Sequence, residues 1–253
     1  PQTVAALTAD DVRAFHESCT TRANATISVV GDISAERLNT LLEPYLGDMT
    51  PGEARNTPPS LDGIDRNPAL IRVDMDVPQS TLIMGHMIDL PREHEDFWPL
   101  HVANSIFGSM GMSHRLFTEV RAKRGLAYGV GSGVAPLKGR AMFRMSTATR
   151  NAAVDEAMTV MRTEMAKWVE NGVTAQELAD AKAYLSGEYP IRLGTNTTIL
   201  TYLTLIQQED LPFDYMDTRV DKILAVSQED IQRALTRHLN PDDLTVVIVG
   251  GSQ

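Results

Sequence analysis

Residues Phe107–Tyr128 read FGSMGMSHRLFTEVRAKRGLAY, and the remainder of the chain can be placed around this stretch. A glycine-punctuated loop opens it, and a short helix follows because apolar residues such as Leu116 and Val120 recur at helical spacing. Gly125 supplies the residue type that most often ends a helix. Aromatic, small and β-branched residues predominate from Tyr128 to Val134, which predicts a strand directly after the helix.

The composition is that of a globular protein with a substantial core. Of the 253 residues, 43% are hydrophobic and 22% are charged. The net charge of −10 argues against a nucleic-acid partner, because phosphate binding requires clustered lysine and arginine. Cys19 is the single cysteine, so an internal disulfide is excluded and the redox compartment stays open. No apolar run approaches the roughly 20 residues that a membrane-spanning helix requires.

The beginning and the end of the chain repeat each other. The helix start at Leu7–Val12 matches Val226–Ile231, and the strand expected after it at Thr26–Gly31 matches Thr245–Gly250. The offset is 219 residues in both cases (226 minus 7 and 250 minus 31), so the match is gapless. A period this long indicates duplicated domains of about 220 residues rather than a solenoid.

Composition marks a boundary between the two units. A helix with leucines on one face is expected over Ser34–Met49, and residues 1–49 are then the tail of a preceding homologous domain. Residues 50–68 are rich in proline and glycine and are predicted to be an extended interdomain linker. Residues 69–253 are expected to form the complete C-terminal domain.

The complete domain is expected to be α+β, with helices packed on one face of a largely antiparallel sheet. Its strands and helices occur in clusters instead of alternating strictly. The expected strands lie at 71–77, 81–87, 128–134, 141–147 and 244–249. The expected helices lie at 93–106, 154–169, from a capping box at 174–177 onward, and at 197–207, 214–224 and 228–238.

Motifs for several classes of catalysis are absent from the sequence. The six histidines form neither His-x-x-x-His nor His-x-x-Glu-His, so a zinc hydrolase site is not supported and surface or helix-end positions are expected for all six. Gly108-Ser-Met-Gly111 is a weak signal for a phosphate-binding loop. It lacks the Gly-Lys-Ser/Thr ending of one common type and the third glycine of the other. No Gly-x-Ser-x-Gly elbow occurs, and Cys19 has no basic partner nearby in the sequence.

Arg121 and Tyr128 are the remaining candidates for chemistry. An arginine offers a permanent charge and a planar fork of donors, and a tyrosine offers a hydroxyl on a rigid arm. Together they could bind a peptide carbonyl or a developing oxyanion. From residue types alone, the simpler interpretation is a solvated helix charge beside Lys123 and Arg124 and a tyrosine that covers the sheet.

The sequence resembles a family whose motif lies in the same stretch. Residues 113–128, with the pattern SHRLFxxVRxxxGLAY, and residues 104–108, with NxIFG, are similar to the signature of the C-terminal half of pitrilysin/insulinase-family zinc peptidases. The processing-peptidase branch is the most similar in style, and the resemblance covers essentially the whole chain. It implies two similar α+β halves that close around an unfolded peptide, the first of which carries the zinc motif His-x-x-Glu-His.

The resemblance also implies roles for particular residues. Arg121 and Tyr128 would be the catalytic pair that binds the substrate backbone and stabilises the tetrahedral intermediate. Gly108, Ser109, Ser113 and Arg115 would contribute to substrate binding. The sequence departs from the family pattern at Gly108-Ser109, where two adjacent glycines are usual, and it lacks the zinc motif altogether.

We therefore interpret the chain as the substrate-binding C-terminal half of a zinc-dependent endopeptidase, inactive in isolation. No metal site is expected in this chain; zinc is expected in an N-terminal half or in a partner subunit, with which the chain forms a dimer. The resemblance allows a bacterial periplasmic or cytoplasmic setting. One alternative is a non-catalytic scaffold subunit of the same fold that binds a partner protein, which would not need both Arg121 and Tyr128. Another is an unrelated α+β binding domain.

Overall fold

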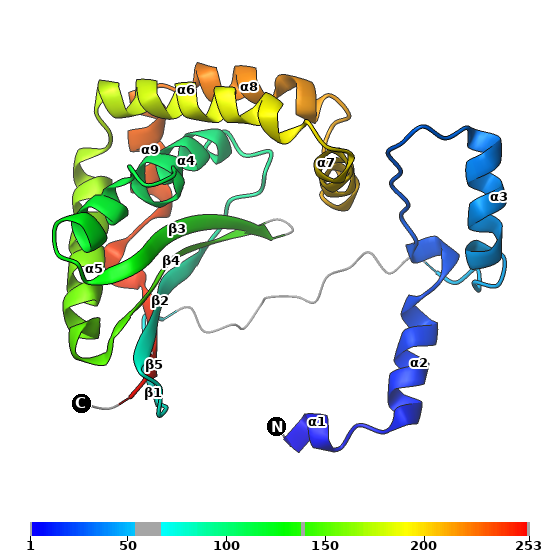
Figure 1. The fold of residues 1–253 in the computed structure, drawn as a ribbon, viewed down its shortest axis with the longest axis horizontal. Helices are drawn as coiled ribbons and strands as arrows, with labels where there is room; N and C mark the ends of the chain where they lie inside the picture. The colour runs from blue at the N-terminus through cyan, green and yellow to red at the C-terminus, as the bar shows by residue number, and fades with distance from the viewer. Residues whose placement is uncertain (1, 54–66, 138–139, 252–253) are drawn as a thin grey trace. The chain divides into compact units, whose positions relative to one another are not determined.

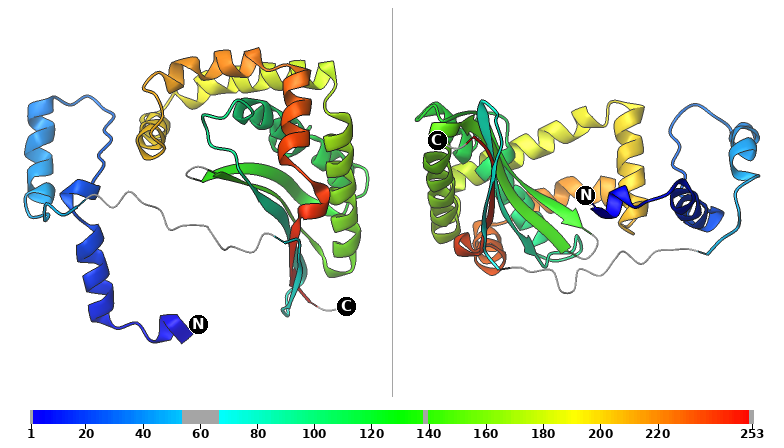
Figure 2. Two further views of the ribbon diagram at one scale, coloured as in Figure 1. Left: turned by 180° about the vertical axis from the view of Figure 1, so that it is seen from behind. Right: turned by 90° about the horizontal axis from the view of Figure 1, so that it is seen from below.

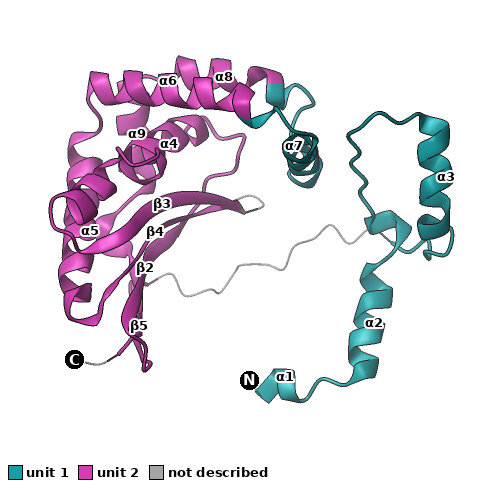
Figure 3. Cartoon of the chain, in the orientation of Figure 1, with its two compact units in different colours: residues 1–61, 192–216 teal, residues 62–191, 217–253 magenta. Residues whose placement is uncertain are grey.

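The computed structural model describes residues 2–53, 67–137 and 140–251 (Figure 1). The chain separates into two compact units, one of residues 1–61 and 192–216 and the other of residues 62–191 and 217–253 (Figure 3). Most of the predicted linker at 50–68 lies outside the described residues. The boundaries proposed from the sequence, at 1–49, 50–68 and 69–253, stay predictions.

The larger unit is built around one five-stranded sheet. Its strands are β1 (Leu70–Asp74), β2 (Gln79–Ile88), β3 (Ala127–Leu137), β4 (Arg140–Arg150) and β5 (Thr245–Gly250). They lie in the order β1-β5-β2-β4-β3, with β1 parallel to β5 and every other neighbouring pair antiparallel. The predicted α+β class with a largely antiparallel sheet is therefore confirmed, and β3, which carries Tyr128, is an edge strand.

Helices cover one face of this sheet (Figure 2). α4 (Phe97–Asn104) and α5 (Val154–Asn171) contact the sheet, and α9 (Gln228–His238) packs on both of them. α6 (Ala175–Arg192) and α8 (Tyr215–Ala225) are the remaining long helices that belong mostly to this unit. The alternation of the strands explains the arrangement, because Leu82 and Met84 on β2 are fully buried whereas Ile83 between them is 38% exposed. Phe107 stacks on Trp168 of α5 with ring centroids 4.2 Å apart, which fixes the start of the motif stretch in the core.

The smaller unit consists of α1 (Gln2–Ala5), α2 (Ala9–Cys19), α3 (Ala35–Leu46) and α7 (Asn196–Gln208). Its helix α2 adopts the same local structure as its repeat counterpart α9. Each opens with a capping box, formed by Thr8 with Asp11 and by Ser227 with Asp230. Each is followed by a short 3-10 helix, at Arg22–Asn24 and at Pro241–Asp243. None of the described helices is long and apolar enough to cross a membrane.

The repeat diverges at the strand. Thr245–Gly250 forms β5 between β1 and β2, whereas the matching residues 26–31 form no strand. A strand needs a hydrogen-bonded neighbour, and nothing in the described part of the chain pairs with 26–31. The helix expected at 93–106 also differs, because α4 begins at Phe97 and a π-helical segment, Ser105–Ser109, continues it.

Helix α4 carries a histidine that is held in its neutral form. The His101 ring lies parallel to Phe97, and its Nε2 accepts a hydrogen bond from Nη2 of Arg219 at 3.3 Å, since a guanidinium can only donate. Burial, followed by the charges of Arg219 and Arg92, lowers the pKa of His101 to about 3.

This histidine predicts a loss of stability in acid. The pKa of His101 in the folded protein lies below its value near 6.5 in the unfolded chain. The stability that neutral His101 contributes is therefore fully present above pH 6.5 and is lost as the pH falls toward 3. At pH 5 the loss amounts to about 2 kcal/mol. The free energy of unfolding can be measured with urea at pH 7.5 and pH 5, followed by the fluorescence of Trp98 and Trp168. The difference between the two pH values should be about 2 kcal/mol smaller in His101→Gln than in the wild type. His16→Gln, at an exposed position of α2, is the control and should keep the wild-type pH difference.

Candidate functional site

The segment that carries Arg121 is anchored at both ends. It begins after the buried His114, whose Nδ1 accepts a hydrogen bond from the backbone N–H of Phe117 at 3.0 Å. Leu116 and Val120 are fully buried and hold its inner face in the core. It ends at Gly125, whose φ of 60° is the left-handed conformation that glycine adopts most easily. The predicted helix is confirmed, although Phe117–Ala122 winds as a π-helix.

The structure brings Arg121 and Tyr128 together. The Arg121 guanidinium carbon lies 4.3 Å from the centroid of the Tyr128 ring and 4.9 Å from that of Phe117, so the cation packs on both aromatic rings. Tyr128 is 84% exposed. Its exposure follows from a shift in the pairing of β3 with β4 between Ala127 and Val130, because such irregularities redirect side chains.

Arg121 differs from its two basic neighbours in its partners. Lys123 and Arg124 both form ion pairs with Glu119, at 2.6 and 2.7 Å. The hydrogen bonds from Arg124 and Lys123 hold the pKa of Glu119 below its ordinary value. The negative charge of Glu119 is therefore neutralised by these two residues and not by Arg121. Within residues 2–53, 67–137 and 140–251, no carboxylate forms an ion pair with Arg121. Its donors are therefore available to a carbonyl or an oxyanion.

Gly108 and Ser109 lie where the π-helical segment meets β3. Asn104 connects them, because its Nδ2 donates to the Ser109 hydroxyl at 3.3 Å and its Oδ1 accepts from the Ser132 hydroxyl at 2.7 Å. Gly108 is buried against β3, and a β-carbon at this position would lie 2.5 Å from the backbone nitrogen of Ser132. The geometry gives both residues a part in fixing the loop to the edge strand, and their contact with substrate stays a prediction.

Replacing Gly108 with alanine should destabilise the larger unit by about 2–3 kcal/mol, because overpacking displaces the backbone of β3. Gly187→Ala is the matched control. A β-carbon there meets no atom within 4 Å, and the position lies inside α6, so a gain of about 0.5–1 kcal/mol is expected. Urea midpoints followed by tryptophan fluorescence measure both. Equal effects of the two substitutions would contradict the tight approach at Gly108.

Arg115 is committed to an ion pair. Its Nε and Nη2 donate to the two carboxylate oxygens of Glu177 at 2.7 and 2.6 Å. Glu177 also accepts the backbone N–H of Thr174 at 2.8 Å, which confirms the predicted capping box of α6. Burial raises the pKa of Glu177, but the bonds from Arg115 and Thr174 outweigh it and keep the pKa below its ordinary value. The predicted substrate contacts of Arg115 and Ser113 are not tested by this arrangement.

Two participants were not identified from the sequence. Phe117 forms the second aromatic surface against Arg121, and its position four residues earlier on a helix was the available signal. Asn104 connects the loop to β3, and nothing in its sequence context indicates the contact with Ser132 across 28 positions.

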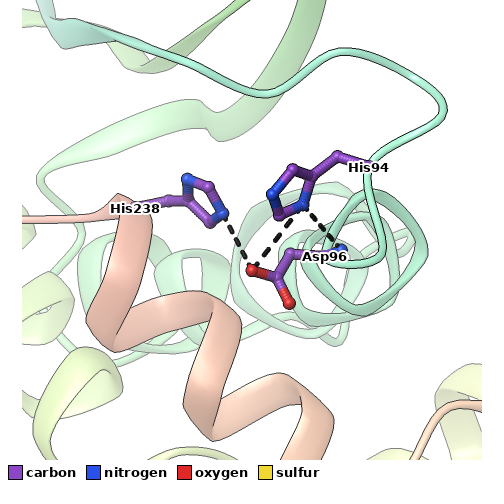
Figure 4. A group of neighbouring side chains, drawn as sticks. All are labelled: His94, Asp96 and His238. Atoms are coloured by element: carbon purple, nitrogen blue, oxygen red, sulfur yellow. Dashed lines mark hydrogen bonds and ion pairs between the residues drawn. The ribbon is translucent and has the colours of Figure 1, made fainter.

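A group of His94, Asp96 and His238 could in principle hold a metal ion (Figure 4). Their ligand atoms lie within 4.8 Å of one another. The Asp96 carboxylate is fully buried, however, and already accepts bonds from Arg233 at 3.0 Å, Arg237 at 2.9 Å and His238 at 3.0 Å. A cation there would have to displace two guanidinium groups, so the group does not fit zinc and is a structural ion-pair network between α4 and α9.

The protonation states support this interpretation. Burial raises the pKa of Asp96, but the bonds from Arg233 and His238 and the charge of Arg237 outweigh it and hold the pKa below its ordinary value. Burial lowers the pKa of His238, which favours the neutral ring. In the tautomer that carries its proton on Nε2, the neutral ring donates a hydrogen bond to Asp96. His238 is half-buried at the C-terminal end of α9, and His114 is buried directly before the motif helix, so both occupy the helix-end positions predicted for them.

Comparison with known proteins connects this geometry to a family of peptidases. The family model described as “Peptidase M16 inactive domain” matches residues 6–185. An uncharacterized zinc protease of Streptomyces coelicolor is 27% identical over 249 residues, which cover 93% of this chain and 52% of the relative. A non-peptidase homolog of Helicobacter pylori is 27% identical over 184 residues, which cover 70% of this chain and 41% of the relative.

A solved structure gives the same result. The peptidase M16 inactive domain from Pseudomonas fluorescens is 26% identical, with a TM-score of 0.83 over 100% of this chain and 60% of that one. The chain therefore spans about half the length of the curated relatives it matches.

Proposed function

The chain belongs to the peptidase M16 inactive-domain family, and we propose that it serves as the substrate-binding half of a zinc-dependent endopeptidase. The zinc would be supplied by an N-terminal half or a partner subunit of the same family. This chain lacks the inverted zinc motif, and its one His/Asp/His group among the described residues does not fit the metal. Its own part is to bind and orient the peptide.

The observation that carries the proposal is the Arg121–Tyr128 pair. A guanidinium that pairs with no carboxylate of the described residues is packed on the ring of a tyrosine that is 84% exposed. The ring and the guanidinium are thereby held together where a peptide can reach both. The pair presents N–H and O–H donors that can bind a peptide carbonyl and the charge that develops on it.

The strand that bears Tyr128 supports an extended substrate. β3 is an edge strand, and within the described residues its outer edge has no neighbour. Residues 127–136 of this strand carry none of the charged side chains that protect many exposed edges, and the pairing with β4 is regular from Val130 to Leu137. A polypeptide could add to this edge through main-chain hydrogen bonds while its carbonyl group meets Arg121.

A scaffold subunit is the second candidate, favoured by one relative that is named a non-peptidase homolog. If this chain is the substrate-binding half, the zinc-bearing half needs it to cleave a peptide. If this chain is a scaffold, the zinc-bearing half cleaves without it. Mixing the zinc-bearing half with the 253-residue chain should produce cleavage of an unstructured fluorogenic peptide that neither part gives alone. Full activity of the zinc-bearing half by itself would support the scaffold and exclude the proposal.

A further inference from the structure

A hollow of about 530 Å³ lies between the motif stretch and α6. Its lining includes Met112, Arg115, Glu177, Asp180 and Tyr184. Its volume falls within the range of pockets that bind small molecules or side chains. The lining residues belong to the larger unit and to the described part of the chain.

Part of the wall of this hollow is apolar and partly exposed. Met112 is 73% exposed at the tip of the loop, and Tyr184 on α6 is 40% exposed. Ile106, which is buried, and the partly buried Met110 form the deeper surface. Methionine side chains are flexible and polarizable, so they adapt to aliphatic groups of different shape.

One charge in the hollow has no counter-charge. Arg115 and Glu177 neutralise each other through their two hydrogen bonds. The Asp180 carboxylate accepts only the neutral amide of Gln176, at 2.8 Å, and no described lysine or arginine forms an ion pair with it. The lining residues therefore combine an aliphatic wall with a single uncompensated negative charge.

We propose that this hollow binds the side chain of a lysine or arginine from an extended polypeptide. The aliphatic stem would lie on Met112 and Tyr184, and the cationic end would meet Asp180, since long basic side chains place their stems on apolar surfaces. The net charge of −10 adds attraction for a basic segment. This inference rests on the proposed function, because the hollow borders the loop that leads into the Arg121 segment.

The test compares two short unstructured peptides that differ only at one central position, arginine or its neutral analogue citrulline. Fluorescence anisotropy with the full chain should show about three- to fivefold tighter binding of the arginine peptide, the preference expected for one partly exposed charge pair. Raising the salt concentration should reduce the preference. Asp180→Asn should abolish it, whereas Asp217→Asn, which removes an exposed charge on α8, should preserve it.

The other outcomes separate this proposal from the proposed function. Equal binding of both peptides that weakens in Arg121→Ala would overturn the assignment of the hollow and leave the proposed function standing. A preference that survives in Asp180→Asn would do the same. Absence of binding by either peptide would overturn both.

Discussion

Replacing Arg121 with alanine should lower kcat/KM of the assembled peptidase by about 10²–10³-fold, the loss measured when one donor to a developing oxyanion is removed. The guanidinium is held on the rings of Phe117 and Tyr128, so it is oriented before the peptide arrives. Tyr128→Phe keeps the ring and removes only the hydroxyl, and a smaller loss of about tenfold is expected. Steady-state cleavage of a fluorogenic peptide measures both.

Arg124→Ala is the matched control for this experiment. It removes the same charge three residues away, but Arg124 is paired with Glu119. Its kcat/KM should stay within about twofold of the wild type. If Arg121→Ala and Arg124→Ala have the same small effect, Arg121 is only a surface charge.

Replacing Asp96 with alanine should destabilise the larger unit by about 3 kcal/mol. The carboxylate is fully buried and accepts bonds from Arg233, Arg237 and His238. Removing one partner of a buried ion-pair network leaves the others uncompensated, and this costs more than the pairs themselves contribute. The two arginines are partly exposed and can be rehydrated, so the lower end of the usual range is expected. Urea unfolding followed by Trp98 and Trp168 fluorescence, both in this unit, gives the value.

Glu95→Ala is the control for the neighbouring carboxylate. Glu95 pairs with Arg237 at 2.9 Å, but its side chain is 64% exposed, so a change of less than about 1 kcal/mol is expected. Zinc and a chelator should both leave the wild-type urea midpoint unchanged. An increase in the midpoint on adding zinc would show that His94, Asp96 and His238 form a metal site after all.

The sequence was sufficient for the fold because its local signals agreed with one another. Alternation over β2 and β4, the capping box at Thr174, the helix start at Val226–Ile231 and Gly125 after the motif helix each corresponded to an element of the structure. The strand expected at 26–31 was wrong because its pattern specifies an apolar segment but cannot supply a neighbour.

The candidate site was predicted only in part, for a physical reason. Arg121 and Tyr128 are separated by a single turn, so their proximity follows from local structure. Other contacts of the motif stretch do not follow from local structure, because Ser132 lies 28 positions from Asn104 and Glu177 lies 62 positions from Arg115. Such pairs depend on how segments far apart in the sequence pack together. Residue type and local spacing do not predict that packing.

The binding role of Arg121 and Tyr128 is tested most directly by titrating the chain with an unlabelled unstructured peptide and following the NMR signals of the Arg121 Nε–H group and the Tyr128 ring. Both signals should shift and saturate together, with Phe117 responding through its contact with Arg121. Binding that leaves both signals unchanged, or no binding at all, would contradict the claim that this chain binds substrate through Arg121 and Tyr128.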